Sequence, residues 1–86
     1  MRKKIAILGS TGSIGKTLLS IIEKDKKNYE VVLLTAHKDY KTLFNQAKKF
    51  NVKNLIITNS KSYENFNKKN FGSKINVFKS FKVLNK

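Results

Sequence analysis

The feature that most constrains the fold of this sequence is an apolar run that leads directly into three evenly spaced glycines. Residues 5–8 are apolar throughout, and Gly9, Gly12 and Gly15 follow in the spacing G-x-x-G-x-x-G. An apolar run without alternation is typical of a strand in a parallel sheet that is covered on both faces. Because apolar residues then recur at helical spacing, the sequence predicts a strand, a glycine turn and a helix in that order.

The predicted helix after the glycines carries one apolar stripe. Its members fall at positions i, i+4, i+7 and i+8, the spacing of a single helix face: Ile14, Leu18, Ile21 and Ile22. We expect this face to pack on the sheet, with Lys16, Glu23 and Lys24 turned outward. A second apolar run at residues 31–34 completes a β-α-β unit.

The alternation of strand and helix continues downstream. A second amphipathic helix is predicted after Asp39, its expected N-cap, and a strand follows around residues 55–57. A weaker helical stretch comes after Asn59, a break follows at residues 72–73, and residues 75–78 suit a fourth strand. The apolar positions of the two later helices are Tyr40, Leu43, Ala47, Phe50, Tyr63 and Phe66.

This order of elements predicts the α/β class, as a Rossmann-like open parallel sheet with flanking helices and about four strands. We expect the strand at residues 5–8 to lie in the centre of the sheet. No linker divides the 86 residues, so we interpret residues 1–86 as the N-terminal part of one dinucleotide-binding Rossmann domain. A sheet that stopped here would leave unpaired edge groups, which indicates an incomplete domain.

Composition excludes several kinds of site. The chain has no cysteine and a single histidine, so neither a disulfide framework nor a histidine metal cluster is available. Residues 5–8 are too few for a signal peptide or a membrane span, so we expect a cytoplasmic protein without a membrane partner. A formal net charge of +14 leaves a small basic nucleic-acid-binding module as an alternative. That alternative ranks second, because no reading helix, RNA-binding aromatic motif or zinc site accompanies the charge.

The glycine spacing favours a dinucleotide. The first glycine permits the tight turn, the second lets backbone approach a phosphate, and the third permits close packing of the helix on the sheet. The helix N-terminus attracts a diphosphate, to which Ser10, Thr11 and Ser13 can add hydroxyl donors. A nucleoside-triphosphate loop, suggested by the sequence Gly-Lys-Thr at residues 15–17, is a third alternative, but its first glycine would fall at Ser10.

The end of the second strand distinguishes the two nicotinamide cofactors. NAD-binding domains usually have an acid there, which binds the ribose hydroxyls and repels a 2′-phosphate. This chain has Ala-His-Lys-Asp at residues 36–39. His37 or Lys38 can pair with a 2′-phosphate, which favours NADPH. Asp39 is either the acid of an NAD site or the N-cap of the following helix.

Two stretches of the chain resemble a known family. Residues 7–15 read ILGSTGSIG and residues 31–58 read VVLLTAHKDYKTLFNQAKKFNVKNLIIT. They resemble the N-terminal part of the 1-deoxy-D-xylulose 5-phosphate reductoisomerase family, for which the string Gly-Ser-Thr-Gly-Ser-Ile-Gly is highly characteristic. The resemblance covers nearly the whole chain but only the opening segment of a much longer enzyme.

The resemblance implies an NADPH-dependent oxidoreductase and isomerase of non-mevalonate isoprenoid biosynthesis. Such an enzyme rearranges and reduces 1-deoxy-D-xylulose 5-phosphate to 2-C-methyl-D-erythritol 4-phosphate with Mg²⁺ or Mn²⁺, and the family implies a homodimer. The acidic metal ligands, the Asn-Lys-Glu stretch, the substrate loop and the C-terminal helical domain of the family have no counterpart here. We therefore expect no catalytic residue, no metal ligand and no catalysis by this chain alone, and contact with the sugar phosphate only through the missing domains.

The resemblance also implies individual cofactor contacts. By motif, Thr11, Gly12, Ser13 and Ile14 would contact the diphosphate and its neighbouring groups. The family's Gly-Lys-Asn after the second strand aligns with residues 37–39, where only the lysine matches. Together with the glycine turn, the predicted cofactor-binding residues are Gly9, Thr11, Gly12, Ser13, Ile14, Gly15, His37, Lys38 and Asp39.

Overall fold

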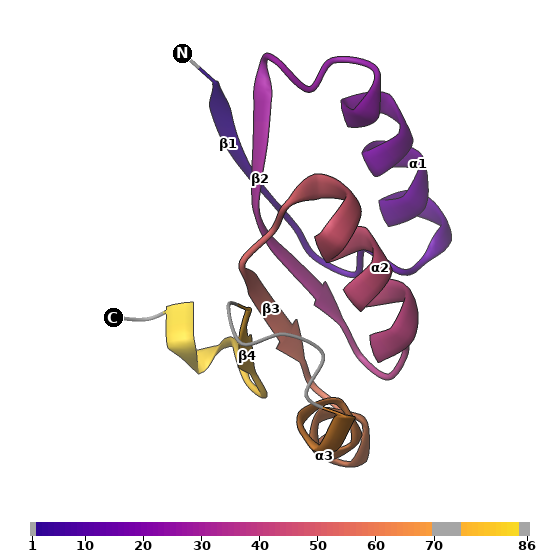
Figure 1. Ribbon diagram of the computed structural model, residues 1–86, viewed down its shortest axis with the longest axis vertical. Helices are drawn as coiled ribbons and strands as arrows, with labels where there is room; N and C mark the ends of the chain where they lie inside the picture. Colours follow the sequence, from indigo (N-terminus) through magenta and orange to yellow (C-terminus); the bar gives the residue numbers. More distant parts are fainter. Residues whose placement is uncertain (1, 70–74, 85–86) are drawn as a thin grey trace.

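The chain folds as an alternation of strands and helices around one parallel sheet (Figure 1). The computed structural model describes residues 2–69 and 75–84, so the predicted break at residues 72–73 lies outside the described residues. The elements are β1 (Lys3–Ile7), α1 (Ser13–Glu23), β2 (Tyr29–Ala36), α2 (Tyr40–Phe50), β3 (Asn54–Ile57), α3 (Ser60–Lys69), β4 (Asn76–Phe78) and the 3-10 helix η1 (Phe81–Leu84). The predicted α/β class, with an open parallel sheet of four strands and flanking helices, is confirmed.

The order of the strands corrects one prediction. The sheet runs β1-β2-β3-β4, so β1 lies at its edge and not in its centre. Each strand pairs in parallel with the next along the chain, because every β-α-β crossover between the described strands steps in the same direction. Within residues 2–69 and 75–84, β1 therefore pairs only with β2. Its other edge has main-chain N–H and C=O groups directed away from the sheet.

The core is concentrated around β2, α2 and β3. The largest side chains with less than 2% exposure include Leu34, Leu43, Leu55, Ile56 and Ile57, which come from these three elements. Phe66 of α3 packs against α2, where its ring meets those of Tyr40 and Phe44 edge to face. β1 is less enclosed, since Ala6 is exposed, and the predicted burial of both faces is wrong for this strand.

The buried face of α1 differs from the predicted stripe. Gly15, Leu19 and Ile22 are buried, whereas Ile14, Leu18 and Ile21 are 79%, 44% and 59% exposed. The cause is Gly15: a Cβ built there would lie 2.5 Å from the Gly9 carbonyl oxygen. This contact turns the Gly15 side of the helix toward the glycine turn, so the residues four and seven positions later face the sheet.

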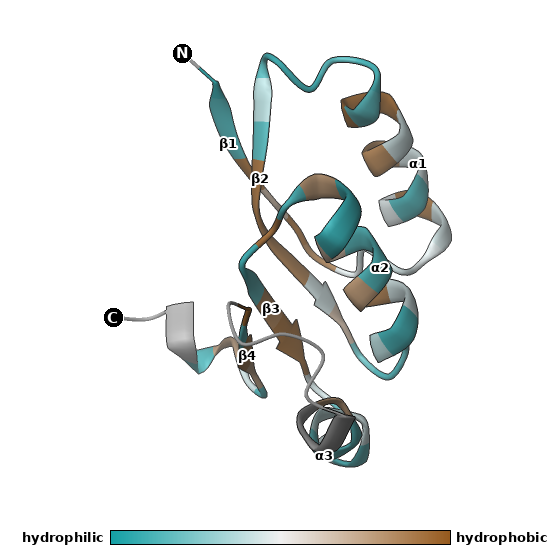
Figure 2. Ribbon diagram, viewed as in Figure 1, coloured by the Kyte–Doolittle hydropathy of each residue, from teal (hydrophilic) through white to brown (hydrophobic). Residues whose placement is uncertain are grey.

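An apolar groove results at the edge of the sheet, where the outer side of α1 meets β1. It is lined by Ile5, Ala6, Ile7, Leu8, Leu18, Ile21, Ile22 and Tyr29. The brown segments of α1 and β1 in Figure 2 mark the hydrophobic residues on these two elements. A continuous apolar surface of this kind is uncommon on an isolated small protein.

Candidate dinucleotide-binding site

The three glycines of the turn between β1 and α1 meet different structural demands. Gly9 has a φ of +69°, a left-handed conformation that favours glycine, although a Cβ there would meet nothing within 4 Å. Gly15 allows close approach, since its Cβ would lie 2.5 Å from Ser10 Cα. The close contact of Gly15 is with the turn itself and not, as expected, with the sheet. At Gly12 a Cβ would make only an ordinary contact of 3.5 Å with the Gly9 carbonyl oxygen.

The N-terminus of α1 is open. Gly12 is the N-cap residue, its backbone is extended with φ −81° and ψ 175°, and no side chain caps the helix. There is no acidic residue in the first turn. The N–H groups at the start of a helix have no acceptor within the helix, so they are available to an anion. Gly12, Ser13 and Ile14 are exposed and Thr11 is half-buried.

Ser10 does not face the site, contrary to the prediction that its hydroxyl is a ligand donor. It is fully buried, and its Oγ donates to Oε1 of Gln46 over 2.8 Å. Gln46 Nε2 donates back to the Ser10 carbonyl over 2.9 Å. The Ser10 N–H donates to the Thr35 carbonyl, and the Gly9 N–H donates to Thr35 Oγ1. The turn is therefore fixed to both β2 and α2.

The sequence analysis did not predict a role for Thr35 and Gln46 in the turn, although the position of each in its element points to one. Thr35 is a hydroxyl residue at the end of an apolar strand, and it is only 3% exposed. Gln46 precedes Ala47 on the inward side of α2, where an apolar residue is the usual choice. A polar side chain at a core-facing position indicates a specific hydrogen-bond partner. The sequence alone does not show which residue that hydrogen-bond partner is.

The segment after β2 lies at the same edge of the sheet as the glycine turn. Thr35, which bonds to the turn, is two residues before His37, and the carboxyl ends of parallel strands share one edge. His37, Lys38 and Asp39 are all exposed. His37 Nδ1 lies 2.7 Å from Oγ1 of Thr58, which follows β3, so only Nε2 of the ring is left for another partner. The structure thus brings the two predicted groups of residues to one edge.

Asp39 is the N-cap of α2, as one of its two interpretations predicts. Its carboxylate accepts a hydrogen bond of 3.1 Å from the Thr42 N–H. Hydrogen bonds from the Thr42 side chain and backbone hold the pKa of Asp39 below its ordinary value, and the positive charge of Lys16 acts in the same direction.

The positions of Lys16 and Thr17 do not support the alternative of a nucleoside-triphosphate loop. Thr17 Oγ1 donates to the Ser13 carbonyl over 3.0 Å, within α1, and Lys16 is exposed on the same helix. A triphosphate loop requires these two residues at the mouth of a phosphate-wrapping turn.

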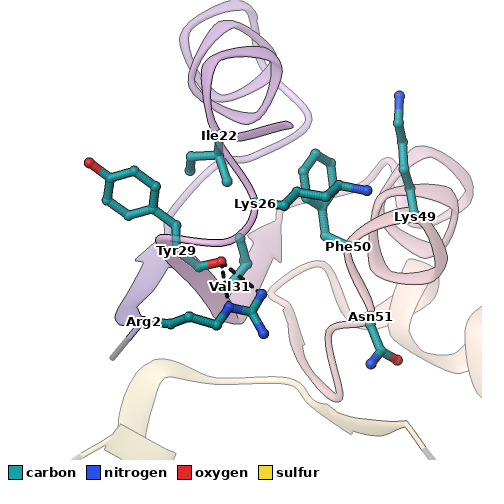
Figure 3. A pocket seen from close by; sticks show the side chains of 8 residues that line it. All are labelled: Arg2, Ile22, Lys26, Tyr29, Val31, Lys49, Phe50 and Asn51. Carbon is teal, nitrogen blue, oxygen red and sulfur yellow. Dashed lines mark hydrogen bonds between the residues drawn. The ribbon is translucent and has the colours of Figure 1, made fainter. Parts of the chain in front are cut away.

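The basic residues at the opposite end of the sheet do not form a common anion site. There the guanidinium of Arg2 donates to the Tyr29 carbonyl over 2.8 and 3.2 Å. Lys26 lies over the Phe50 ring, 5.3 Å from its centroid, and Lys49 pairs with Glu23 at 3.0 Å. In Figure 3 the Lys49 ammonium points to the top of the view, whereas the Arg2 guanidinium lies lower down, beside the Tyr29 carbonyl. The nucleic-acid alternative is not supported.

Among residues 2–69 and 75–84, no helix has the length and apolar character required to cross a bilayer. In the same ranges, no three side chains of His, Cys, Asp or Glu come together as potential metal ligands.

A parallel α/β sheet whose first strand passes through a glycine turn into an uncapped helix defines the Rossmann-like class of domain. More specifically, the model of the 1-deoxy-D-xylulose 5-phosphate reductoisomerase family matches residues 5–84. The chain belongs to that family.

Individual relatives agree with the family match. The reductoisomerase of Pelagibacter ubique is 52% identical over 84 residues, which are 98% of this chain and 22% of that protein. The solved structure of the Zymomonas mobilis reductoisomerase in complex with NADPH matches with a TM-score of 0.86 and 31% identity, over 98% of this chain and 22% of that one. A reductoisomerase in complex with NADPH, fosmidomycin and magnesium matches with a TM-score of 0.84 and 26% identity, over 95% and 20%. The chain thus spans about a fifth of the length of these relatives.

Proposed function

We propose that this chain is the NADPH-binding N-terminal portion of a 1-deoxy-D-xylulose 5-phosphate reductoisomerase. The proposed reaction of the whole enzyme is the rearrangement and reduction of 1-deoxy-D-xylulose 5-phosphate to 2-C-methyl-D-erythritol 4-phosphate. The observation that carries the proposal is the open N-terminus of α1 behind Gly12, in a fold that matches an NADPH complex at a TM-score of 0.86. A cytoplasmic location and a homodimer of the whole enzyme belong to the same proposal.

The diphosphate of the cofactor would bind at the start of α1. The N–H groups of Ser13, Ile14 and Gly15 are the first of the helix, and an anion there gains both hydrogen bonds and the favourable end of the helix dipole. Thr11 and Ser13 add hydroxyls, and Gly9 sets the direction of the turn. A Cβ at position 12 would make only an ordinary contact of 3.5 Å within the chain, so a phosphate-bearing ligand offers a reason for the missing side chain.

The 2′-phosphate of NADPH would lie near His37 and Lys38. Both side chains are exposed beyond the end of β2, and the one acidic residue of the segment 37–39 is Asp39. Asp39 already accepts from the Thr42 N–H, which weakens its role as an acceptor for ribose hydroxyls. This arrangement supports NADPH over NADH.

The described residues do not fit a Mg²⁺ or Mn²⁺ site. Such a site needs several converging oxygen ligands, whereas Glu23 pairs with Lys49, Asp25 accepts from Asn28, and Asp39 caps α2. We therefore derive no metal-assisted step from this chain. Its own chemical contribution is to bind the cofactor and hold the diphosphate in place, while the nicotinamide supplies the hydride when the cofactor is bound.

The proposal is tested by titrating the ¹⁵N-labelled chain with NADPH and NADH and following amide resonances. We expect NADPH to shift the amides of Thr11, Gly12, Ser13 and Ile14 at lower concentration than NADH does. Gly12→Val should remove these shifts, because its side chain would occupy the space in front of the helix. Gly12→Ala shows whether a single methyl group at this position is enough to weaken binding. Equal responses of Gly12→Val and the original chain, or shifts confined to other regions, would reject the proposal.

A further inference from the structure

A buried polar cluster lies behind the glycine turn, on the side away from the proposed cofactor. It consists of Ser10, Thr35 and Gln46, of which Ser10 is 0% and Thr35 3% exposed. Gln46 is the member that comes from α2, 36 residues along the chain from Ser10. Buried polar side chains are costly unless each finds a partner, and in the described residues none of the buried side-chain N and O atoms lacks one.

The contact between Gln46 and Ser10 has two points. Ser10 Oγ donates to Gln46 Oε1 over 2.8 Å, and Gln46 Nε2 donates to the Ser10 carbonyl over 2.9 Å. The amide of Gln46 supplies both the acceptor and the donor that this arrangement needs. A carboxylate would place a negative oxygen against the Ser10 carbonyl. A hydrocarbon would remove the donor to that carbonyl and leave Ser10 Oγ with only its longer contact of 3.4 Å to the Thr35 carbonyl.

Ser10 occupies the position from which the whole turn is fixed. Its neighbour Gly9 has the left-handed φ, and the Gly12 N–H donates to the Gly9 carbonyl over 3.1 Å. The backbone of Gly15, in the first turn of α1, lies directly against Ser10, as shown by the 2.5 Å from a built Cβ to Ser10 Cα. A shift of Ser10 therefore moves both the turn and the N–H groups at the start of α1.

We propose that Gln46 is a positioning residue: through Ser10 it holds the glycine turn in the conformation that receives a dinucleotide diphosphate. This inference rests on the proposed cofactor function and deepens it. Gln46 does not touch the ligand; it acts from α2, the same helix whose N-cap follows His37 and Lys38. The helix α2 thus connects the proposed diphosphate and 2′-phosphate regions mechanically.

The test compares cofactor binding by Gln46→Leu, Gln46→Glu and the original chain, with the folded fraction of each measured by denaturant unfolding. We expect both variants to bind NADPH and NADH about tenfold more weakly or worse, even after correction for the unfolded fraction. The ratio of the two affinities should stay unchanged, because the diphosphate is common to both cofactors. Lys38→Ala is the matched comparison, since it should weaken the binding of NADPH and leave the binding of NADH unchanged.

Val52→Ala tests whether Gln46 acts only through the stability of the fold. It is a core truncation outside the turn, so it should destabilise the fold but leave the corrected affinities unchanged. A second measurement needs no cofactor: amide exchange at Ser10 and Gly12 should accelerate in Gln46→Leu beyond the change in global stability. If the original chain binds NADPH and Gln46→Leu binds it equally well after correction, the positioning role is overturned while the proposed function stands. If the original chain shows no NADPH binding, both are overturned.

Discussion

The helices α1 and α2 each have 11 residues and lie beside one another, since Glu23 of α1 forms an ion pair with Lys49 of α2. Their ends and their outer sides nevertheless differ. α2 starts at a capping carboxylate and is closed by its C-cap residue Asn51, which has a left-handed φ of 57°. Its exposed residues are polar: Lys41, Asn45, Lys48 and Lys49.

α1 starts without a side-chain cap at Gly12 and exposes Ile14, Leu18 and Ile21. Within the part of the chain that the structure describes, α2 is complete in itself, whereas α1 has two features without partners, its N-terminus and its apolar side. An open helix N-terminus suits an anion, and an exposed apolar surface marks a contact with another surface. The contrast therefore separates a helix that is closed at both ends and polar on its outer side from one whose N-terminus and outer apolar side are open to the solvent.

Among the variants that test this difference between α1 and α2, we expect Gly15→Ala to have the largest effect on the free energy of unfolding. Alanine normally favours a helix over glycine by about 1 kcal/mol. Here its Cβ would lie 2.5 Å from two backbone atoms, so we expect a net loss of more than about 3 kcal/mol in the free energy of unfolding. Gly12→Ala is the control, with a change below about 1 kcal/mol, because its Cβ meets only one atom at 3.5 Å. Denaturant unfolding of the two variants measures both, and equal stabilities would contradict the fixed rotation of α1.

A smaller effect is expected from truncating neighbouring leucines on α1. Leu19 is 3% exposed and Leu18 is 44% exposed. Leu19→Ala should lower the free energy of unfolding by about 2 to 3 kcal/mol, whereas Leu18→Ala should lower it by less than about 1 kcal/mol. The same denaturant experiment compares them. A larger loss at Leu18 would mean that the stripe predicted from the sequence, and not the observed face, packs on the sheet.

The leucine pair also shows where sequence reasoning succeeds and where it stops. The alternation of strands and helices, the parallel sheet and the Asp39 N-cap follow from local patterns, namely apolar runs, helical periodicity and capping residues. The rotation of α1 does not, because it is set by the contact of Gly15 with Ser10, a packing constraint that periodicity ignores. The edge position of β1 depends on the direction of successive crossovers, which local patterns do not encode.

The candidate site divides in the same way. The glycine spacing identifies the turn, and the position after the second strand identifies residues 37–39. The inward orientation of Ser10 depends on a partner in α2, 36 residues away, and the pairing of His37 with Thr58 depends on the neighbouring strand. Contacts between residues distant in sequence are therefore the part of the site that required the structure.

The smallest of the expected effects concerns the capped start of α2. Asp39→Ala removes the acceptor of the Thr42 N–H, so we expect a loss of about 1 kcal/mol at pH 7. Because the pKa of Asp39 is lower in the folded chain than its ordinary value, the capping contribution is fully present above that ordinary value, near pH 4. It is lost as the pH falls below this point and the carboxylate becomes protonated. The difference between the original chain and Asp39→Ala should therefore shrink below about pH 4 in denaturant unfolding curves.

Asp39→Asn separates the cap from the charge. Asparagine caps helices about as well as aspartate, so the stability at pH 7 should change little while the acid dependence of the cap disappears. Removal of the negative charge beside His37 and Lys38 should at the same time strengthen the binding of NADPH relative to NADH. If Asp39→Asn instead lost as much stability as Asp39→Ala, the start of α2 would depend on charge rather than on the capping hydrogen bond. The contrast between a self-capped α2 and an open α1 would then rest on electrostatics alone.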